Sequence, residues 1–439
     1  MTQVKNQKKD RYLSFYFFIM YLFTAMPAIQ FSMIENTNLL FLGLGYGLTF
    51  ITAYKYKISF NNKKLLLILG IIIIWTCVQI ILHRAYFRLS PFIIMEVLAA
   101  FVIIETYKET IYRRFENITY YLCVIALIGW ILSIILHSLV TYLANGIGIE
   151  ASGEKSSTFI IYTVNLTDNY RNCGFGWEPG RFACLTCIGV LFYLIRTKLK
   201  FRTLRFWIMT ACIASTMSTT GFCVYMAIIL LSYWSFHKIS ILQISIASIF
   251  VVCILSLPFM GTKIKDLIGQ ASGDAISTMG RKLTWNSENN ADSDFYIPQR
   301  FEGLMFSVMN VMNTNYLIGD GRDFQNFYIN RVMDWKVKTS EGVLEIVVRY
   351  GVILAILCYY YLYKASVMIS SFYKVSNKWL YFVTFILINI SYNFWEVPVF
   401  MSIWMMPIYL HSKESKHKTS LSSHIKYHNT VSNKPILVN

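Results

Sequence analysis

The sequence predicts an all-α, polytopic integral membrane protein with about twelve transmembrane helices and one large external loop. Of its 439 residues, 56% are hydrophobic and only 14% are charged, whereas a soluble domain carries about 25% charged residues. Apolar runs long enough to cross a bilayer as helices recur along the whole chain. The basic residues gather in short segments between alternate runs, as the positive-inside rule produces.

The expected spans follow one another from the amino terminus. The first, at 12–31, is too long and too aromatic for a cleaved signal peptide. Two later pairs form tight hairpins that turn at 218–221 and at 392–398, and their helices are short against the usual crossing of about 20 residues. In chain order, the expected spans are 12–31, 38–54, 65–82, 91–107, 118–144, 180–195, 206–218, 221–236, 240–258, 342–363, 379–394 and 396–411.

The alternation of basic segments places the amino terminus in the cytoplasm and puts 145–179, 218–221 and 259–340 outside. A helix on the outer membrane surface is expected within the long loop, because apolar residues recur at helical spacing over 301–309. The chain therefore divides into 1–258 with transmembrane helices one to nine, the external loop 259–340, the last three helices in 341–411, and a disordered cytoplasmic tail at 412–439.

Several classes of protein and site are disfavoured by the same composition. The net charge of +17 reports membrane topology and not a nucleic-acid partner, because the charge sits in the cytoplasmic segments. Nine cysteines, an odd number found mainly in apolar runs, give no disulfide framework. No histidine lies in 259–340, so neither a His-based metal site nor a Ser–His arrangement is visible outside. We expect no metal and no cofactor.

The most informative segment is N-C-G-F-G-W-E-P-G-R-F-A, at 172–183, together with the preceding Arg171. Arg171, Glu178 and Arg181 lie where an exposed loop meets a long apolar helix, and ionisable groups at such a place are functional candidates. A structural alternative is a capped helix start, with Glu178 near the positive end of the dipole and Pro179 at the first helical position. The two interpretations are compatible.

Further charged side chains gather on the same predicted outer face. Arginine presents a planar fork that binds phosphate or carboxylate in a bidentate manner, so these positions suit an anionic substrate. The Gly-Asp-Gly turn at 319–321 offers backbone amides to phosphate, although it is equally an ordinary loop. The candidate substrate-binding residues are Arg300, Arg322, Arg331, Asp320 and Asp323.

The start of the span after the loop carries two carboxylates, Glu341 and Glu345, one helical turn apart. They either cap the helix or take part in chemistry, and Glu345 could simply pair with Arg349 one turn further on. Glu396 could be an interfacial residue, because Trp395 and a proline flank it.

Four pieces of the sequence, in order, resemble the Wzy-type O-antigen and capsular polysaccharide polymerases, which are related to the O-antigen ligases. They are Arg-x-x-Gly-Phe-x-x-Glu-Pro-Gly-x-x-Ala at 171–183, Ser-Thr-Thr-Gly at 218–221, Asn-Tyr-Leu-Ile-Gly-Asp-Gly at 315–321, and the helix start at 341–351. The resemblance covers about residues 165–360. Residues 1–164 match only in being hydrophobic.

The resemblance implies a multi-pass glycosyltransferase of the bacterial cytoplasmic (inner) membrane, acting on its outer face without a cofactor. The growing glycan, held on undecaprenyl diphosphate, would pass to a new lipid-linked repeat unit, with a chain-length regulator and a flippase as candidate partners. Catalysis would fall to Glu178, Arg171, Arg181 and Glu345, with a carboxylate as general base and arginines stabilising the leaving diphosphate. Arg331 to Gly342 has the Arg-x10-Gly spacing of one family loop.

Two departures from the family pattern separate the alternatives. The turn 218–221 lacks the arginine often found there. The loop also lacks the histidine associated with the ligases, and the absence of that histidine disfavours a ligase. A lipid-linked oligosaccharide flippase or transporter is the alternative of another class. It should carry charges along a path between spans, whereas here they gather on one face.

Overall fold

The fold is that of a computed structural model with side chains. It describes residues 2–25, 35–83, 92–147, 149–150, 156–159, 161–165, 170–176, 178–237, 298, 300–313, 316–333, 337–339 and 341–410. The expected span at 240–258, the first part of the loop at 259–297 and the tail at 412–439 lie outside these residues.

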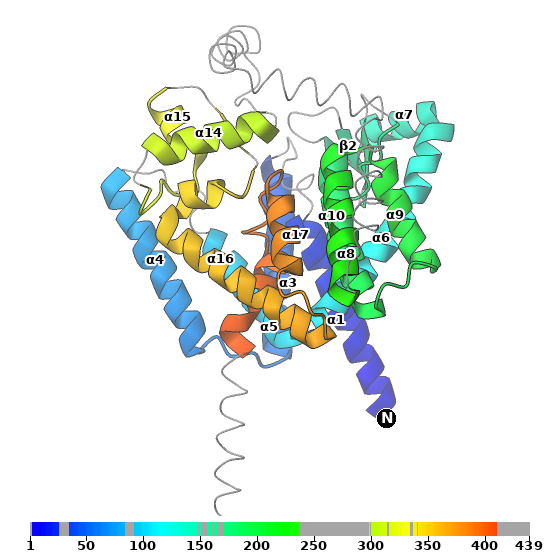
Figure 1. Cartoon of the computed structure of the whole chain (residues 1–439), viewed down its shortest axis with the longest axis horizontal. Helices are drawn as coiled ribbons and strands as arrows, with labels where there is room; N and C mark the ends of the chain where they lie inside the picture. The colour runs from blue at the N-terminus through cyan, green and yellow to red at the C-terminus, as the bar shows by residue number, and fades with distance from the viewer. Residues whose placement is uncertain are drawn as a thin grey trace, which may run out of the picture.

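The described chain is mostly helical (Figure 1). Within it, the helices at 63–82, 110–135, 179–197, 219–236 and 345–373 are long and apolar enough to cross a membrane, which identifies a membrane-embedded helical protein. The helices are α1 Thr2–Ala25, α3 Glu35–Lys55, α4 Lys63–His83, α5 Phe92–Tyr107, α6 Thr110–Ile135, α7 His137–Ile147, α8 Pro179–Thr197, α9 Leu204–Ser215, α10 Thr219–Phe236, α14 Arg300–Asn313, η1 Phe324–Asn326, α15 Tyr328–Arg331, α16 Glu345–Tyr373, α17 Leu380–Asn389 and the final helix Pro398–Leu410.

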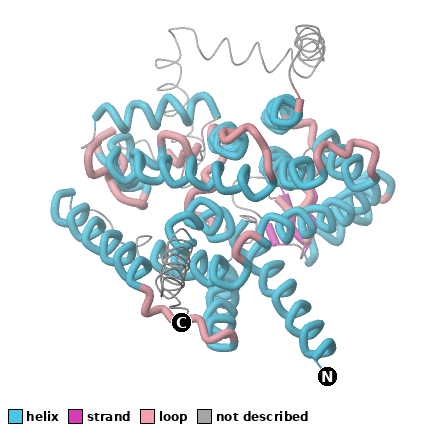
Figure 2. Tube along the Cα trace, turned by 60° about the horizontal axis from the view of Figure 1, so that its bottom comes forward, coloured by secondary structure: helices cyan, strands magenta, loops and turns pink. Residues whose placement is uncertain are grey.

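A small antiparallel sheet departs from the all-helical expectation. Its strands are β1 Ile149–Glu150, β2 Ser156–Phe159 and β3 Tyr162–Asn165, in the order β1-β2-β3. Figure 2 shows these strands as a minor element among the helices. They fall in the 145–179 segment, where the sequence predicted an external feature without assigning it a structure.

Helix α8 occupies the centre of the bundle, and nearly all of its residues are buried. It contacts α6, α9 and α10. Small residues permit this close approach. A Cβ at Gly189 would lie 2.6 Å from the Thr119 side chain of α6, and a Cβ at Gly221 of α10 would meet Ala183. The central helix is therefore the one that begins at the Glu178–Pro179 pair.

Two expected spans differ in form from the observed helices. The run at 118–144 is interrupted at Leu136, whose backbone leaves the helical region (φ −111°, ψ 41°), so α6 ends and α7 begins. The run at 342–363 becomes the longer α16, which contains a kink at Gly351 (φ 77°, ψ 166°).

The amino-terminal end of α1 and helices α14 and α15 lie at opposite ends of the bundle (Figure 1). The helix expected over 301–309 is confirmed as α14. Its buried Phe306 packs with Ile329 and Val337 of the same loop, while Met312 is 77% exposed. The loop thus forms a small core of its own above the transmembrane helices.

Candidate functional site

The turn at 389–396, between α17 and the final helix, joins several distant parts of the chain. The side-chain oxygen of Asn389 accepts a hydrogen bond from the Phe394 amide at 3.0 Å, which closes the turn. The Gly342 amide donates to the Asn389 carbonyl at 2.6 Å, and the Trp395 indole donates to the Gly342 carbonyl at 2.9 Å. The segment that leads into α16 is therefore fastened to this turn.

Glu396, at the end of the turn, binds two arginines. Arg322 Nη2 lies 2.9 Å from Glu396 Oε2 and also 2.9 Å from Glu96 Oε1 of α5. Arg349 Nη1 of α16 lies 2.6 Å from Glu396 Oε2, and the same guanidinium pairs with Glu345. We call Glu96, Arg322, Glu345, Arg349 and Glu396 the charged cluster.

The charged cluster is shielded from solvent, since its side chains are at most 14% exposed. Burying such groups is expensive unless each charge keeps its partner. Burial by itself lowers the pKa of Arg322, but the carboxylates of Glu396 and Glu96 outweigh it, so that pKa lies well above its usual value. The Arg322 guanidinium is thereby held charged in a fixed position.

The charged cluster still has hydrogen-bonding capacity to offer. The buried atoms Arg349 Nε, Glu345 Oε2 and Glu96 Oε2 have no hydrogen-bond partner within the part of the chain that the structure describes. Buried polar atoms in proteins nearly always have a partner. A cluster of this kind is suited to meet a polar ligand or ordered water.

The segment that carries Arg322 reaches the cluster by docking along the kink of α16. The amides of Asp320 and Gly321 donate to the carbonyls of Val348 and Arg349 at 2.7 and 3.0 Å. These carbonyls are open to them because the positive φ of Gly351 breaks the regular helix there. The two amides are occupied, so they do not serve as the phosphate cradle that the Gly-Asp-Gly sequence allowed.

Two side chains of α4 fix the same segment from the other side. The Trp75 indole donates to the Ile318 carbonyl at 2.9 Å. The Gln79 amide donates to the carbonyls of Ile318 and Arg349 at 2.8 and 2.7 Å. Helix α4 is thereby linked to both the loop and α16.

The Arg171–Ala183 segment also contacts the turn. The Arg181 guanidinium lies 4.7 Å from the ring centre of Phe394, and Arg181 is only 8% exposed. Arg171 Nε donates to the Thr216 carbonyl at 3.2 Å, beside the Ser-Thr-Thr-Gly turn. Thr220 of that turn lies within hydrogen-bonding distance of Ser391, at 3.3 Å between hydroxyl oxygens.

Glu178 precedes α8 in extended conformation, with Pro179 at the first turn, so the expected helix start is confirmed. Its side chain makes no capping hydrogen bond and is half-buried. The carboxylate is therefore not committed to holding the helix end. Glu341 behaves differently: its Oε2 accepts from the amides of Val343 and Leu344 at 2.9 and 3.0 Å, which is the capping alternative.

The remaining predicted residues do not enter the charged cluster. Asp323 caps η1 by accepting from the Gln325 amide at 3.3 Å. Arg331 ends α15 and is exposed. Arg300 is the first residue of α14, and its side chain lies outside the described part of the structure. Asp320 lies within the docked segment and is fully buried.

The pKa of Asp320 should make loop docking depend on pH. Burial raises this pKa to about 7, against the opposing effects of Arg331 and the Tyr328 amide. In the unfolded chain the pKa of this carboxyl group is about 4. The contribution of Asp320 to the free energy of unfolding is therefore fully present below pH ~4 and falls as pH rises towards 7. The Val352 amide of α16 reports docking, because it donates to the Tyr316 carbonyl of the docked segment at 2.7 Å. Its hydrogen exchange, corrected for intrinsic rates, should therefore show weaker protection at pH 7.5 than at pH 5.

Asp320→Asn should remove most of this pH dependence, because the amide has no proton to lose. Asp323→Asn is the matched control, since asparagine also caps a helix start. An unchanged pH dependence in Asp320→Asn would rule out Asp320 as its source.

Two residues of this region, Glu96 and Lys338, were missed by the sequence analysis, and Glu396 was interpreted there only as an interfacial residue. Glu96 and Glu396 both belong to the charged cluster, and Glu96 could have been found as a carboxylate inside an apolar run. Lys338 lies near Arg349 and Glu345, with its Nζ 5.2 Å from the Phe324 ring centre. Burial and the charge of Arg349 lower the pKa of Lys338 to about 8. Its sequence neighbourhood gave no signal.

Comparisons of the chain with protein-family models, curated proteins and solved structures return no match.

Proposed function

We propose that this protein polymerises oligosaccharide repeat units carried on undecaprenyl diphosphate, at the outer face of the bacterial cytoplasmic membrane. One observation carries the proposal. The four sequence pieces that resemble the polysaccharide polymerases are dispersed over 171–351. Three of them contact the turn at 389–396 directly, through Arg181, Thr220 and Arg349, and the piece at 315–321 docks on α16 and leads into Arg322, which binds Glu396. The convergence supports a single site built from all four.

The proposed reaction exchanges one bond for another at the anomeric carbon of the donor glycan. The bond from that carbon to the lipid diphosphate breaks, and its electron pair leaves with the phosphate oxygen. A bond forms to a hydroxyl oxygen of the acceptor repeat unit, and that hydroxyl proton passes to a carboxylate. Cations near the leaving phosphate would stabilise its growing charge.

The contacts favour a division of roles among the charged residues. Arg322 and Arg349 are engaged by carboxylates, so they would hold Glu345 and Glu396 in place. Lys338 lies beside the cluster and Arg181 beside Phe394 of the turn, and both would bind the diphosphate, with Arg171 and Arg331 further out. Glu178 is favoured over Glu345 as the general base, because Glu345 is fully buried and paired with Arg349.

Replacing Glu178 by glutamine tests the base. The change keeps the shape and removes the proton acceptor, so turnover should fall by a hundredfold or more, on the order of general-base contributions. Asp323→Asn serves as the control. Wild-type turnover in Glu178→Gln would return this residue to the role of a helix-start position.

Lys338 should impose an alkaline limit on activity. With a pKa of about 8, it is a cation below that pH and becomes neutral above it. Lys338→Met should therefore lower kcat/KM by about 10- to 100-fold, the size expected for one charge-assisted hydrogen bond. Lys338→Arg should keep the activity and move the alkaline fall to higher pH. The same fall near pH 8 in Lys338→Arg would assign it to another group.

The function itself is tested with purified protein and lipid-linked repeat units. A ladder of polymer should form in lipid vesicles without added nucleotide or metal. In a deletion strain, long chains should disappear while a single capped repeat unit remains. Complete loss of attached glycan would indicate a ligase or a flippase instead.

A further inference from the structure

A cavity of about 490 Å³ lies between the α3–α4 loop and the end of α5. Its Glu105 follows Glu96 of the charged cluster by nine positions, which is about 14 Å along a helix. The α3–α4 loop lies at the end of the bundle that carries the amino-terminal end of α1 (Figure 1). Its volume falls within the range of small-ligand pockets, about 300–1,000 Å³.

The loop wall of the cavity is held in one conformation. The Ile58 amide donates to the Ala53 carbonyl at 2.9 Å, and Lys57 takes the left-handed conformation that ends α3 (φ 52°). Asn62 begins the next helix, where its side-chain oxygen accepts from the Lys64 amide at 3.0 Å. A ligand here would meet a preformed surface, which reduces the ordering needed on binding.

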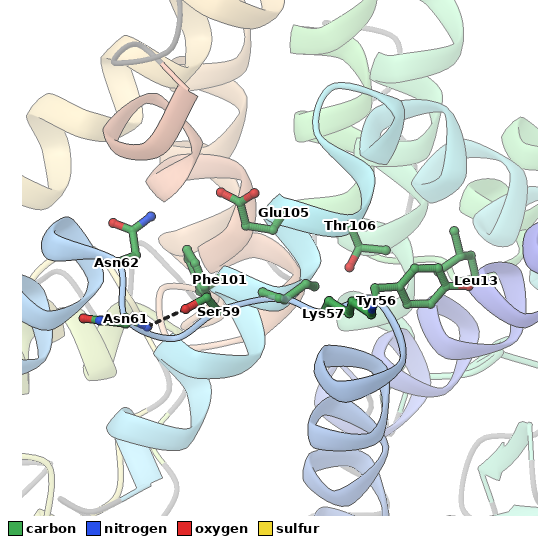
Figure 3. A pocket seen from close by; sticks show the side chains of 10 residues that line it. Leu13, Tyr56, Lys57, Ser59, Asn61, Asn62, Phe101, Glu105 and Thr106 are labelled. Atoms are coloured by element: carbon green, nitrogen blue, oxygen red, sulfur yellow. Dashed lines mark hydrogen bonds between the residues drawn. The ribbon is translucent and has the colours of Figure 1, made fainter.

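The charged groups of the lining are of opposite sign. Lys57 stands on the loop and Glu105 on α5, with the polar side chains of Asn61, Asn62 and Thr106 also lining the space (Figure 3). A purely anionic ligand would meet the carboxylate of Glu105, and a purely cationic one would meet Lys57. The lining fits a group that carries both a phosphate and an N–H-bearing ammonium.

The surroundings of the cavity point to a lipid as the source of that group. The loop joins two helices whose side chains at this level are apolar and exposed: Ile51 and Tyr54 at the end of α3, and Leu66 and Leu67 at the start of α4. In a membrane protein such side chains contact acyl chains. A headgroup in the cavity would thus have its tails beside a matching surface.

We propose that this cavity binds the phosphoethanolamine headgroup of a membrane phospholipid. Lys57 and the asparagine amides receive the phosphate, and Glu105 accepts hydrogen bonds from the primary ammonium. The assignment is independent of the polymerase function, because it uses none of the residues of the charged cluster.

Native mass spectrometry of the full-length protein tests the assignment. The protein is released from vesicles of equal parts phosphatidylethanolamine, phosphatidylcholine and phosphatidylglycerol. We expect preferential retention of phosphatidylethanolamine, since a choline ammonium has no N–H to donate and phosphatidylglycerol has no ammonium. Equal retention of the three lipids would overturn the proposal. Binding of free glycerophosphoethanolamine without retention of the lipid would overturn the lipid as the source.

Two variants locate the bound lipid. Glu105→Gln should abolish the preference over phosphatidylcholine, and Lys57→Ala should lower phosphatidylethanolamine retention by about three- to tenfold, a modest value because Lys57 is exposed. Glu109→Gln and Lys63→Ala are matched controls at the same end of the bundle, outside the lining. An undiminished preference in a folded Glu105→Gln protein would place the lipid elsewhere. If one variant fails to fold, the other decides.

Discussion

Arg349→Met is expected to destabilise the protein by about 3–5 kcal/mol, the loss typical when one partner of a buried ion pair is removed. The change leaves Glu345 and Glu396 facing each other with one guanidinium fewer between them. Thermal unfolding in detergent measures the effect. Arg202→Met is the control, because Arg202 is exposed in the loop between α8 and α9.

A double variant separates the structural effect from a catalytic one. Arg349→Met with Glu345→Gln removes the stranded carboxylate, so much of the lost stability should return. Polymerisation should stay low if Arg349 also meets substrate through its Nε. A single Arg349→Met protein that unfolds at the wild-type temperature would contradict the energetic importance of the charged cluster.

Gly351→Ala is expected to undock the segment at 316–323. A Cβ on Gly351 would collide with the carbonyl of Leu317, and the positive φ of 77° is unfavourable for alanine. We expect a loss of about 3 kcal/mol or more, together with the loss of polymer, since Arg322 would leave the charged cluster. Proteolysis of the loop and thermal unfolding both report it.

Gly70→Ala on α4 is the matched control for this glycine. Nothing lies within 4 Å of the added Cβ there, so alanine should be neutral or slightly stabilising. Gly319→Ala should behave like Gly351→Ala, because Gly319 of the docked segment packs directly against Gly351 of α16. Wild-type stability in Gly351→Ala would show that the kink is not needed for docking.

The sequence predicted the parts of the molecule that local patterns determine. Apolar runs gave most helices, the Glu178–Pro179 pair gave the start of α8, and the spacing of Glu345 and Arg349 gave their ion pair. The capping by Glu341 was also among the alternatives. Each of these depends on residues within about one helical turn.

The parts that were missed depend on distant contacts. The kink at Gly351 frees carbonyls that the segment at 316–323 binds, and no local pattern reports that distant partner. Glu396 looked like an interfacial residue because its arginines come from two other segments. The break at Leu136 and the sheet that follows it were likewise invisible to an apolar-run criterion.

The wide sequence separation within the charged cluster has a consequence for biogenesis. Glu96 and Arg322 are 226 positions apart, and Glu396 comes later still. During synthesis, chains fold from the amino terminus onward, so α5 is made long before Arg322, whose guanidinium pairs with Glu96. A nascent chain thus carries Glu96 without its partner until the segment at 316–323 has been made and has docked. A chain truncated before Arg322 lacks the guanidinium that pairs with Glu96, so this carboxylate stays without its partner.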